Sequence, residues 1–285
     1  MKVVSIQFRF VGNSLGTWVY LVSFDRPGYG QSDLHPKQTM KSIAYNMEEL
    51  ADQLGLGFKF FVIGLSMGGP IACSCLKYIP NRSIRFADRF NIRVTGSTAS
   101  LTGFDRVLTK TGLVGNRTVS STDCRFDFFD RLAGAALIAP VVNYWSPGFP
   151  ANLSKEAYCK QFAQDQWAIR VARYTPRLPY WWNTRKRFPS FSVISGNPKL
   201  SPQDVKLMSS LFMASCLDDQ ENPKQQGEFE SVHRDLMVAF GNWEFDPMDL
   251  DNPFVDNESS VHLWHGDEDG FVPVSLQRYI AARLS

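Results

Sequence analysis

Apolar residues along the chain follow two patterns that alternate, short continuous runs and one-sided helical faces. The runs are WVYLVSF at 18–24, FKFFVIG at 58–64, GAALIAP at 134–140 and VHLWH at 261–265. Short apolar runs bounded by turn residues are typical of strands that are buried on both faces. The pattern therefore predicts four strands spread over the whole chain, the first two of them buried.

Helical faces lie between these runs. Residues 39–57 place Ile43, Met47, Leu50, Ala51 and Leu54 on one side of a helix, and Gly55 or Gly57 is the expected stop. A second helix is expected after residues 62–69 and should end near 79–80, and a last one covers 274–285. Strands that alternate with helices predict an α/β fold with a mostly parallel, doubly wound sheet.

Two segments interrupt this alternation. Residues 141–255 combine many prolines with helical stretches that carry Trp145, Trp167, Trp181 and Trp182, which indicates an aromatic-rich helical cap inserted over the carboxyl edge of the sheet. Residues 83–130 show no sustained period and far exceed the ordinary length of a connection, about 2–6 residues. We interpret 83–130 as a foreign or disordered insertion, with a functional loop as the alternative. The α/β core then comprises residues 1–82, 131–140 and 256–285.

The composition limits the classes of partner. The 30 basic and 28 acidic residues leave a formal net charge of +2, which gives no electrostatic reason to expect nucleic acid or an anionic membrane as partner. A run of basic and aromatic residues at 170–187 is interpreted as a solvated face with snorkelling side-chain stems. Neither a signal peptide nor an apolar run long enough to span a bilayer is found, so the default expectation is a cytoplasmic protein without a transmembrane segment.

The five cysteines lack the spacing of zinc ligands, and we expect buried, reduced thiols in a reducing compartment. Cys73 and Cys75 lie two apart in a predicted helix and point in different directions. The sequence therefore predicts no metal and no other cofactor.

The candidate chemistry centres on Gly64-Leu65-Ser66-Met67-Gly68, which has the pattern G-x-S-x-G between a predicted strand and a predicted helix. Glycines at these positions permit a strained, exposed serine and close packing of the helix behind it. Ser66 is therefore the candidate nucleophile, although the pattern also occurs in structural turns. The backbone amide of Met67, at the positive end of the helix, is the candidate oxyanion donor.

A serine nucleophile also needs a base oriented by an acid. Asp267, Glu268 and Asp269 lie in the loop after the 261–265 run, and an aspartate there can instead cap the last helix. His265 precedes Asp269 and would lie about 13 Å from it along an extended chain. From the residues alone, the choice among the three acids stays open.

Three ordered motifs, SFDRPGYGQSD, VIGLSMGG and LWHGDEDGFVPV, resemble the α/β-hydrolase superfamily, in particular plant-type members that share FDRPGYG and WEFDPMDL. The resemblance covers about 17–82 and 131–285. It implies an esterase- or lipase-type serine hydrolase acting on a small apolar ester. It also implies that Asp269 is the triad acid and that Asp25 and Arg26 are structural.

The chain departs from the family pattern at both ends. The family places the catalytic histidine after the acid, and none of His35, His233, His262 and His265 follows Asp269. The His-Gly turn that donates a second oxyanion amide has no clear counterpart before residue 18. These departures predict a truncated chain with impaired hydrolysis. A catalytically inactive binding protein and a non-functional gene fragment remain the alternatives.

Overall fold

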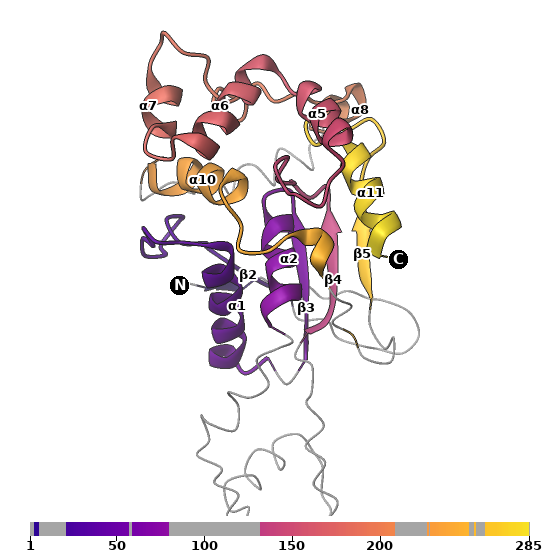
Figure 1. Ribbon diagram of the computed structural model, residues 1–285. Coiled ribbons are helices and arrows are strands. Elements are labelled where there is room, and N and C mark those ends of the chain that lie inside the picture. Colours follow the sequence, from indigo (N-terminus) through magenta and orange to yellow (C-terminus); the bar gives the residue numbers. More distant parts are fainter. Residues whose placement is uncertain are drawn as a thin grey trace, which may run out of the picture.

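Figure 1 shows the computed structural model of the chain, which describes residues 3–5, 21–56, 59–79, 132–208, 227, 229–250, 254 and 260–284. The elements, in order, are β1 (Val3–Ser5), β2 (Val22–Phe24), α1 (Met40–Leu54), β3 (Phe60–Leu65), α2 (Gly68–Tyr78), β4 (Leu132–Ile138), α5 (Ala151–Cys159), α6 (Ala163–Tyr174), α7 (Pro179–Thr184), α8 (Pro202–Met208), the π-helical turn η2 (Phe229–His233), α10 (Arg234–Phe240), the 3-10 turn η3 (Pro247–Asp249), β5 (Val261–Trp264) and α11 (Val274–Leu284).

The central layer is a parallel sheet with the strand order β3-β4-β5. Ile63 pairs with Ala136, which pairs with His262, and Leu65, Ile138 and Trp264 form the next row. The predicted parallel sheet is therefore confirmed for the three strands that carry the last three apolar runs. Among the described residues, β2 pairs with β1 in a separate antiparallel ribbon instead.

The prediction that the first two strands are buried is wrong for the described residues of β2 and β3. In β3, Val62 is buried toward α2, whereas Phe61, Ile63 and Leu65 on the other face are 73%, 57% and 64% exposed. Ile138 and Trp264 continue this exposed face across the sheet. In β2, Ser23 is exposed as well. The described helices thus cover one face of the sheet, and a doubly wound arrangement is not seen in this part of the chain.

Helices α1 and α2 lie side by side on the covered face (Figure 1). The apolar stripe of α1 points inward through Ile43 and Leu50, and the Ser74 hydroxyl donates to the Met40 carbonyl to join the two helices. Gly55 ends α1 in the left-handed conformation that glycine adopts without steric cost, so Gly55 rather than Gly57 is the stop. The end of α2 at Tyr78 agrees with the predicted boundary.

The helices between β4 and β5 lie beyond the carboxyl ends of the strands, with α5, α6, α7 and α8 uppermost in Figure 1 and α10 below α6 and α7. Aromatic side chains hold this helical segment together, and the ring of Tyr144 stacks on that of Phe240 with centroids 6.2 Å apart. Buried alanines of α6 let α10 approach closely. This segment therefore stands over the edge of the sheet where parallel strands of α/β folds present their ligands.

Several predictions concern residues outside the described ranges. The insertion at 83–130 and the first part of the 18–24 run are among them, as are Cys124 and Cys216. Within the described residues, Cys73, Cys75 and Cys159 are free thiols, and Cys159 is exposed rather than buried. No described helix is long and apolar enough to cross a membrane.

Candidate active site

Ser66 occupies a sharp turn between β3 and α2. Its φ of 50° lies in the left-handed region, which a residue with a side chain enters at a cost of about 1–2 kcal/mol. The turn is fixed by two backbone hydrogen bonds, one from the Ser66 amide to the Ile138 carbonyl and one from the Val141 amide to the Ser66 carbonyl. The conformation that a nucleophile turn requires is therefore present at this serine.

The glycines around Ser66 differ in the space that they leave for a side chain. A Cβ on Gly64 would lie 2.5 Å from the Gly68 carbonyl oxygen, and one on Gly69 would lie 2.2 Å from Cβ of Pro140. A Cβ on Gly68 would meet nothing within 4 Å. Gly64 and Gly69 thus permit α2 to pack against the sheet, whereas Gly68 has space for a side chain.

Met67 is the N-cap residue of α2, and its backbone has helical angles. The amides of the first turn of a helix lack intrahelical partners and carry partial positive charge. Because Met67 and Ser66 both line the same cavity, the structure places this amide end beside the candidate nucleophile. The geometry suits an anionic oxygen next to Ser66.

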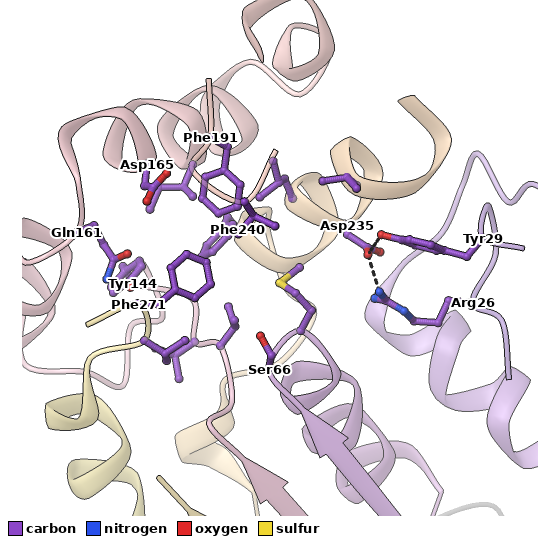
Figure 2. A pocket seen from close by; sticks show the side chains of 18 residues that line it. Arg26, Tyr29, Ser66, Tyr144, Gln161, Asp165, Phe191, Asp235, Phe240 and Phe271 are labelled. Atoms are coloured by element: carbon purple, nitrogen blue, oxygen red, sulfur yellow. Dashed lines mark hydrogen bonds and ion pairs between the residues drawn. The ribbon is translucent and has the colours of Figure 1, made fainter. Parts of the chain in front are cut away.

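Ser66 opens into a cavity of about 170 Å³ between the sheet edge and the helical segment. Figure 2 shows Ser66 at its floor, with Phe271, Tyr144 and Phe240 on one side of it and Asp235 on another. The walls are mostly aromatic and aliphatic. Apolar walls with a few polar groups are typical of small-ligand sites.

One polar corner of the cavity joins the helical segment to the loop after β2. Asp235 of α10 accepts a hydrogen bond of 2.5 Å from the Tyr29 hydroxyl and forms a 2.8 Å ion pair with Arg26 (Figure 2). Burial raises the pKa of Asp235, although Arg26 and Tyr29 both act in the opposite direction. Burial and the charge of Asp235 raise the pKa of Tyr29 well above its ordinary value.

A second buried carboxylate, Asp165 of α6, faces the cavity from the other side. Both of its oxygens are occupied, since the backbone amide and the hydroxyl of Ser192 each donate to it at 2.7 Å. Burial raises the pKa of Asp165 despite these two bonds. Asp165 thus fixes the segment after α7 through Ser192.

Asp269, the acid implied by the family resemblance, lies in the turn after β5. Its Oδ1 accepts the amides of Phe271 and Val272 at 2.8 Å, and its Oδ2 lies 3.4 Å from His265 Nε2. The turn thus brings His265 far closer to Asp269 than an extended chain would. Of its two neighbouring acids, Glu268 is exposed and Asp267 is exposed and paired with Arg278 at 2.7 Å.

The His265–Asp269 pair shifts both pKa values. Burial lowers the pKa of His265. The contact with Asp269 and the Val272 carbonyl, 2.8 Å from His265 Nε2, raise the pKa by more than burial lowers it, so the net shift is upward. Burial raises the pKa of Asp269. The hydrogen bonds from His265 and from the amides of Val272 and Phe271 outweigh burial, so the pKa of Asp269 is lowered. Asp269 is consequently ionised and already engaged.

None of the four histidines, all of which the structure describes, lines the cavity that contains Ser66. His265 contacts Asp269, His262 Nε2 lies 2.8 Å from the Ser260 hydroxyl, and His233 is fully buried with its ring against Tyr180. His35 borders a separate surface groove beside α1. The structure therefore brings together Ser66 and Met67 but adds no histidine to them.

Two features of the site were missed from the sequence. Ala139 also has a positive φ, 42°, and its amide donates to the Trp264 carbonyl, so a second strained residue adjoins the Ser66 turn. Asp235 was not singled out, although it lines the cavity. Neither residue belongs to a recognisable motif.

Other chemistries find little support in the described residues. Burial raises the pKa of the Cys73 thiol to about 12, so it is a poor nucleophile at neutral pH. No group of three acidic, cysteine or histidine side chains in the described ranges could hold a metal ion.

No protein-family model matches the chain, and no curated protein does. Solved structures give weak similarities. An esterase from Rhodococcus sp. is 14% identical with a TM-score of 0.45, and the match covers 95% of this chain and 70% of that one. A thermophilic esterase from Thermogutta terrifontis is 17% identical with a TM-score of 0.36, covering 90% and 65%. A monoacylglycerol lipase from Paleococcus ferrophilus is 14% identical with a TM-score of 0.37, covering 95% and 70%. Similarities at this level assign no activity to the chain.

Proposed function

We propose that this protein is an α/β-hydrolase-like serine hydrolase of the esterase type, with Ser66 as nucleophile and the Met67 amide as oxyanion donor. The observation that carries the proposal is the strained Ser66 at the floor of an apolar cavity, next to the N-terminus of α2. Strain of this kind persists only where surrounding contacts enforce it, and it concentrates at functional sites. The helical segment over the cavity acts as the cap.

The substrate is a small ester with an apolar acyl or aryl group. The cavity volume of about 170 Å³ is close to that of a cavity known to hold a benzene-sized ligand, and its walls are mostly aromatic and aliphatic. Arg26 lines the cavity and is paired with Asp235, so among the described lining residues no unpaired cation is offered to an acidic substrate. Long acyl chains would require the helical segment to move.

Turnover is slow in this proposal because no base stands beside Ser66. In a serine hydrolase the base takes the serine proton during attack and returns it to the leaving group. Here His265 and Asp269 contact each other, and neither lines the cavity that contains Ser66. What remains is oxyanion stabilisation and binding, which give on the order of 10³–10⁴-fold acceleration over water in triad-deficient serine hydrolases.

The same lack of a base supports the second candidate, an inactive hydrolase-like protein that only binds esters. A chemical-rescue experiment distinguishes the two candidate functions. The chain is assayed with p-nitrophenyl acetate with and without added imidazole, which can enter the cavity as an external base. All rates are taken after subtracting the hydrolysis caused by buffer and imidazole without protein. The proposal expects a small protein-dependent rate that imidazole increases and that Ser66→Ala abolishes, whereas Ser195→Ala, an exposed serine, leaves it unchanged.

Two outcomes would contradict the proposal. Hydrolysis that persists in Ser66→Ala with and without imidazole would remove Ser66 from the reaction. A turnover number of about 10 s⁻¹, ordinary for an enzyme, without imidazole and lost in Ser66→Ala would show that a histidine of the chain already serves as base. Ester binding with no Ser66-dependent hydrolysis in either condition favours the binding protein.

A further inference from the structure

The basic and aromatic run at 170–187 takes no part in the proposed reaction. Between residues 166 and 203 the chain carries seven basic residues and no acidic one. These residues cover α6, α7 and the turn that follows, at the upper left of Figure 1, away from the sheet. The segment is the most one-sidedly charged part of the helical layer.

Four aromatic rings on this segment form one stacked group. Trp167 of α6 stacks on Trp182 of α7 at 5.9 Å and 25°, and Trp182 stacks on Phe188 at 4.4 Å and 28°. Trp181 closes on Phe188 at 4.9 Å. Trp167 and Trp181 stay 50% and 43% exposed although they are among the largest apolar side chains. The group is thus ordered by its own contacts and open to solvent along its edge.

Four cations surround these rings. Arg170 lies over the Trp167 ring, 5.6 Å from its centroid, and Arg185, Lys186 and Arg187 form the turn that folds Phe188 back onto Trp182. All four are exposed, and none forms a salt bridge to an acid of the described ranges. We name these four cations and four rings the basic–aromatic patch. Its charge exceeds the formal net charge of +2, so the remainder of the chain is net negative and the molecule is polarised.

Helix α6 connects the patch to the Ser66 cavity. Its inward face carries Ile169, which lines the cavity, and its outward face carries Trp167 and Arg170. If the patch bound an external surface, only helix α6 would lie between that surface and the proposed ester site. This arrangement would place the cavity near apolar molecules dissolved in that surface.

We propose that the basic–aromatic patch docks the protein on an anionic lipid surface. Tryptophan at headgroup depth and basic side chains facing anionic headgroups are the usual means of such peripheral attachment. The charge is complementary, and the exposed tryptophan edges supply the apolar contact. The proposal concerns lying on the surface and is independent of whether Ser66 hydrolyses esters.

Single-stranded nucleic acid is the main competing partner for basic and aromatic residues. Bases bind by stacking on free aromatic faces. In the patch, Trp182 is stacked against Trp167 and Phe188, so faces that bases would need are already occupied. Lipid headgroups need only the exposed edges and the charge, so the stacking favours lipid.

Sedimentation of the full-length chain with vesicles tests the proposal. The vesicles are pure phosphatidylcholine or contain about 30% phosphatidylserine, an anionic fraction that gives a negative surface potential. We expect at least about tenfold stronger partitioning to the anionic vesicles, weakening as salt is added. The triple variant Arg185→Glu, Lys186→Glu, Arg187→Glu should lose on the order of a hundredfold in partitioning, because each basic residue near such a surface contributes roughly fivefold.

A matched control changes the net charge equally elsewhere. Lys37→Glu, Lys155→Glu, Arg283→Glu alters three exposed cations outside the patch and should reduce partitioning by less than about threefold. Trp181→Ala should weaken binding without altering the charge, and Ser66→Ala should bind vesicles like the parent. Circular dichroism confirms that each variant is folded.

Three results would overturn the proposal. One is equal binding to the two vesicle types, and a second is equal loss in the patch variant and the control variant. The third is binding of a single-stranded oligonucleotide by the chain in place of anionic vesicles, which would make the patch a nucleic-acid surface.

Discussion

At the scale of single residues, the Ser66 turn stores strain that the packing of α2 against the sheet must hold. Ser66 and Ala139 both have positive φ and lie at the carboxyl ends of adjacent strands, and Ala139 precedes Pro140, which fills the space beside Gly69. A left-handed residue costs about 1–2 kcal/mol, so the neighbouring contacts have to be close. Gly64 is one such position, because a Cβ there would lie 2.5 Å from the Gly68 carbonyl oxygen.

Gly64→Ala should therefore destabilise the protein by about 1–3 kcal/mol, because the new methyl group would overlap the Gly68 carbonyl and Ala72. Gly68→Ala, two residues beyond Ser66, meets open space and should change stability by less than about 1 kcal/mol, in either direction. Thermal or urea unfolding of the two variants measures the difference. Equal costs would mean that the helix does not pack as closely as described.

The sequence predicts such residues only where a motif fixes the spacing. The G-x-S-x-G pattern predicts the roles of Gly64, Ser66 and Met67, because the turn is formed by five consecutive residues. Asp235 does not, because its partner Tyr29 is 206 residues away and only the assembled fold brings the hydroxyl to the carboxylate. The positive φ of Ala139 cannot be predicted from the sequence, because alanine is not a residue that a sequence pattern associates with the left-handed region.

At the scale of elements, the turn between β5 and α11 is held by charge as well as by backbone hydrogen bonds. Its acid and its histidine contact each other, and the amides of Phe271 and Val272 converge on Asp269. From the sequence the elements on either side were expected within a residue or two, but the closing of the turn was not. Gly266 and Gly270 permit compact geometry without dictating which side chains meet.

The pair should make stability depend on pH. The raised pKa of His265 contributes stability that is fully present below its unfolded pKa, about 6.5, and is lost as pH rises through the folded value. The lowered pKa of Asp269 contributes stability above its unfolded pKa, about 3.9, which is lost as pH falls through the folded value. Both contributions coincide between about pH 4 and 6.5.

His265→Asn should consequently cost about 1 kcal/mol more at pH 5.5 than at pH 8.5, measured by urea unfolding of variant and parent at each pH. His262→Asn, in β5 three residues before His265 and exposed, is the control and should cost less than about 0.5 kcal/mol at both pH values. A cost for His265→Asn that is the same at the two pH values would show that the ring acts by packing alone.

At the scale of the whole molecule, the sheet has two unlike faces. Val62 and Leu137 are buried toward α2, whereas Phe61, Ile63, Leu65, Ile138 and Trp264 are between 38% and 73% exposed on the other face. The continuous apolar runs predicted helices on both sides, because such runs normally occur where both faces are covered. An apolar run indicates that both faces of a strand are suited to burial. It does not indicate which segment of the chain covers each face.

The exposed apolar face should bind an uncharged hydrophobic dye in the folded state. Five large side chains in three rows of the sheet expose on the order of several hundred Å² of apolar surface, as much as the largest patch of a typical monomer. Nile red fluorescence should therefore rise on adding the native chain, before any unfolding transition. Because the dye carries no charge, the basic–aromatic patch adds little to the signal.

Ile63→Lys places a charge at the centre of this face and should lower the dye signal by about half or more, while leaving the unfolding midpoint nearly unchanged, since the side chain is already 57% exposed. Leu54→Lys, at the exposed end of α1 and outside the face, is the matched control and should leave the signal as it is. A native chain that binds no dye, or a large drop in stability for Ile63→Lys, would show that the face is covered in solution. The two faces of the sheet would then both be packed, as the apolar runs of the sequence predict.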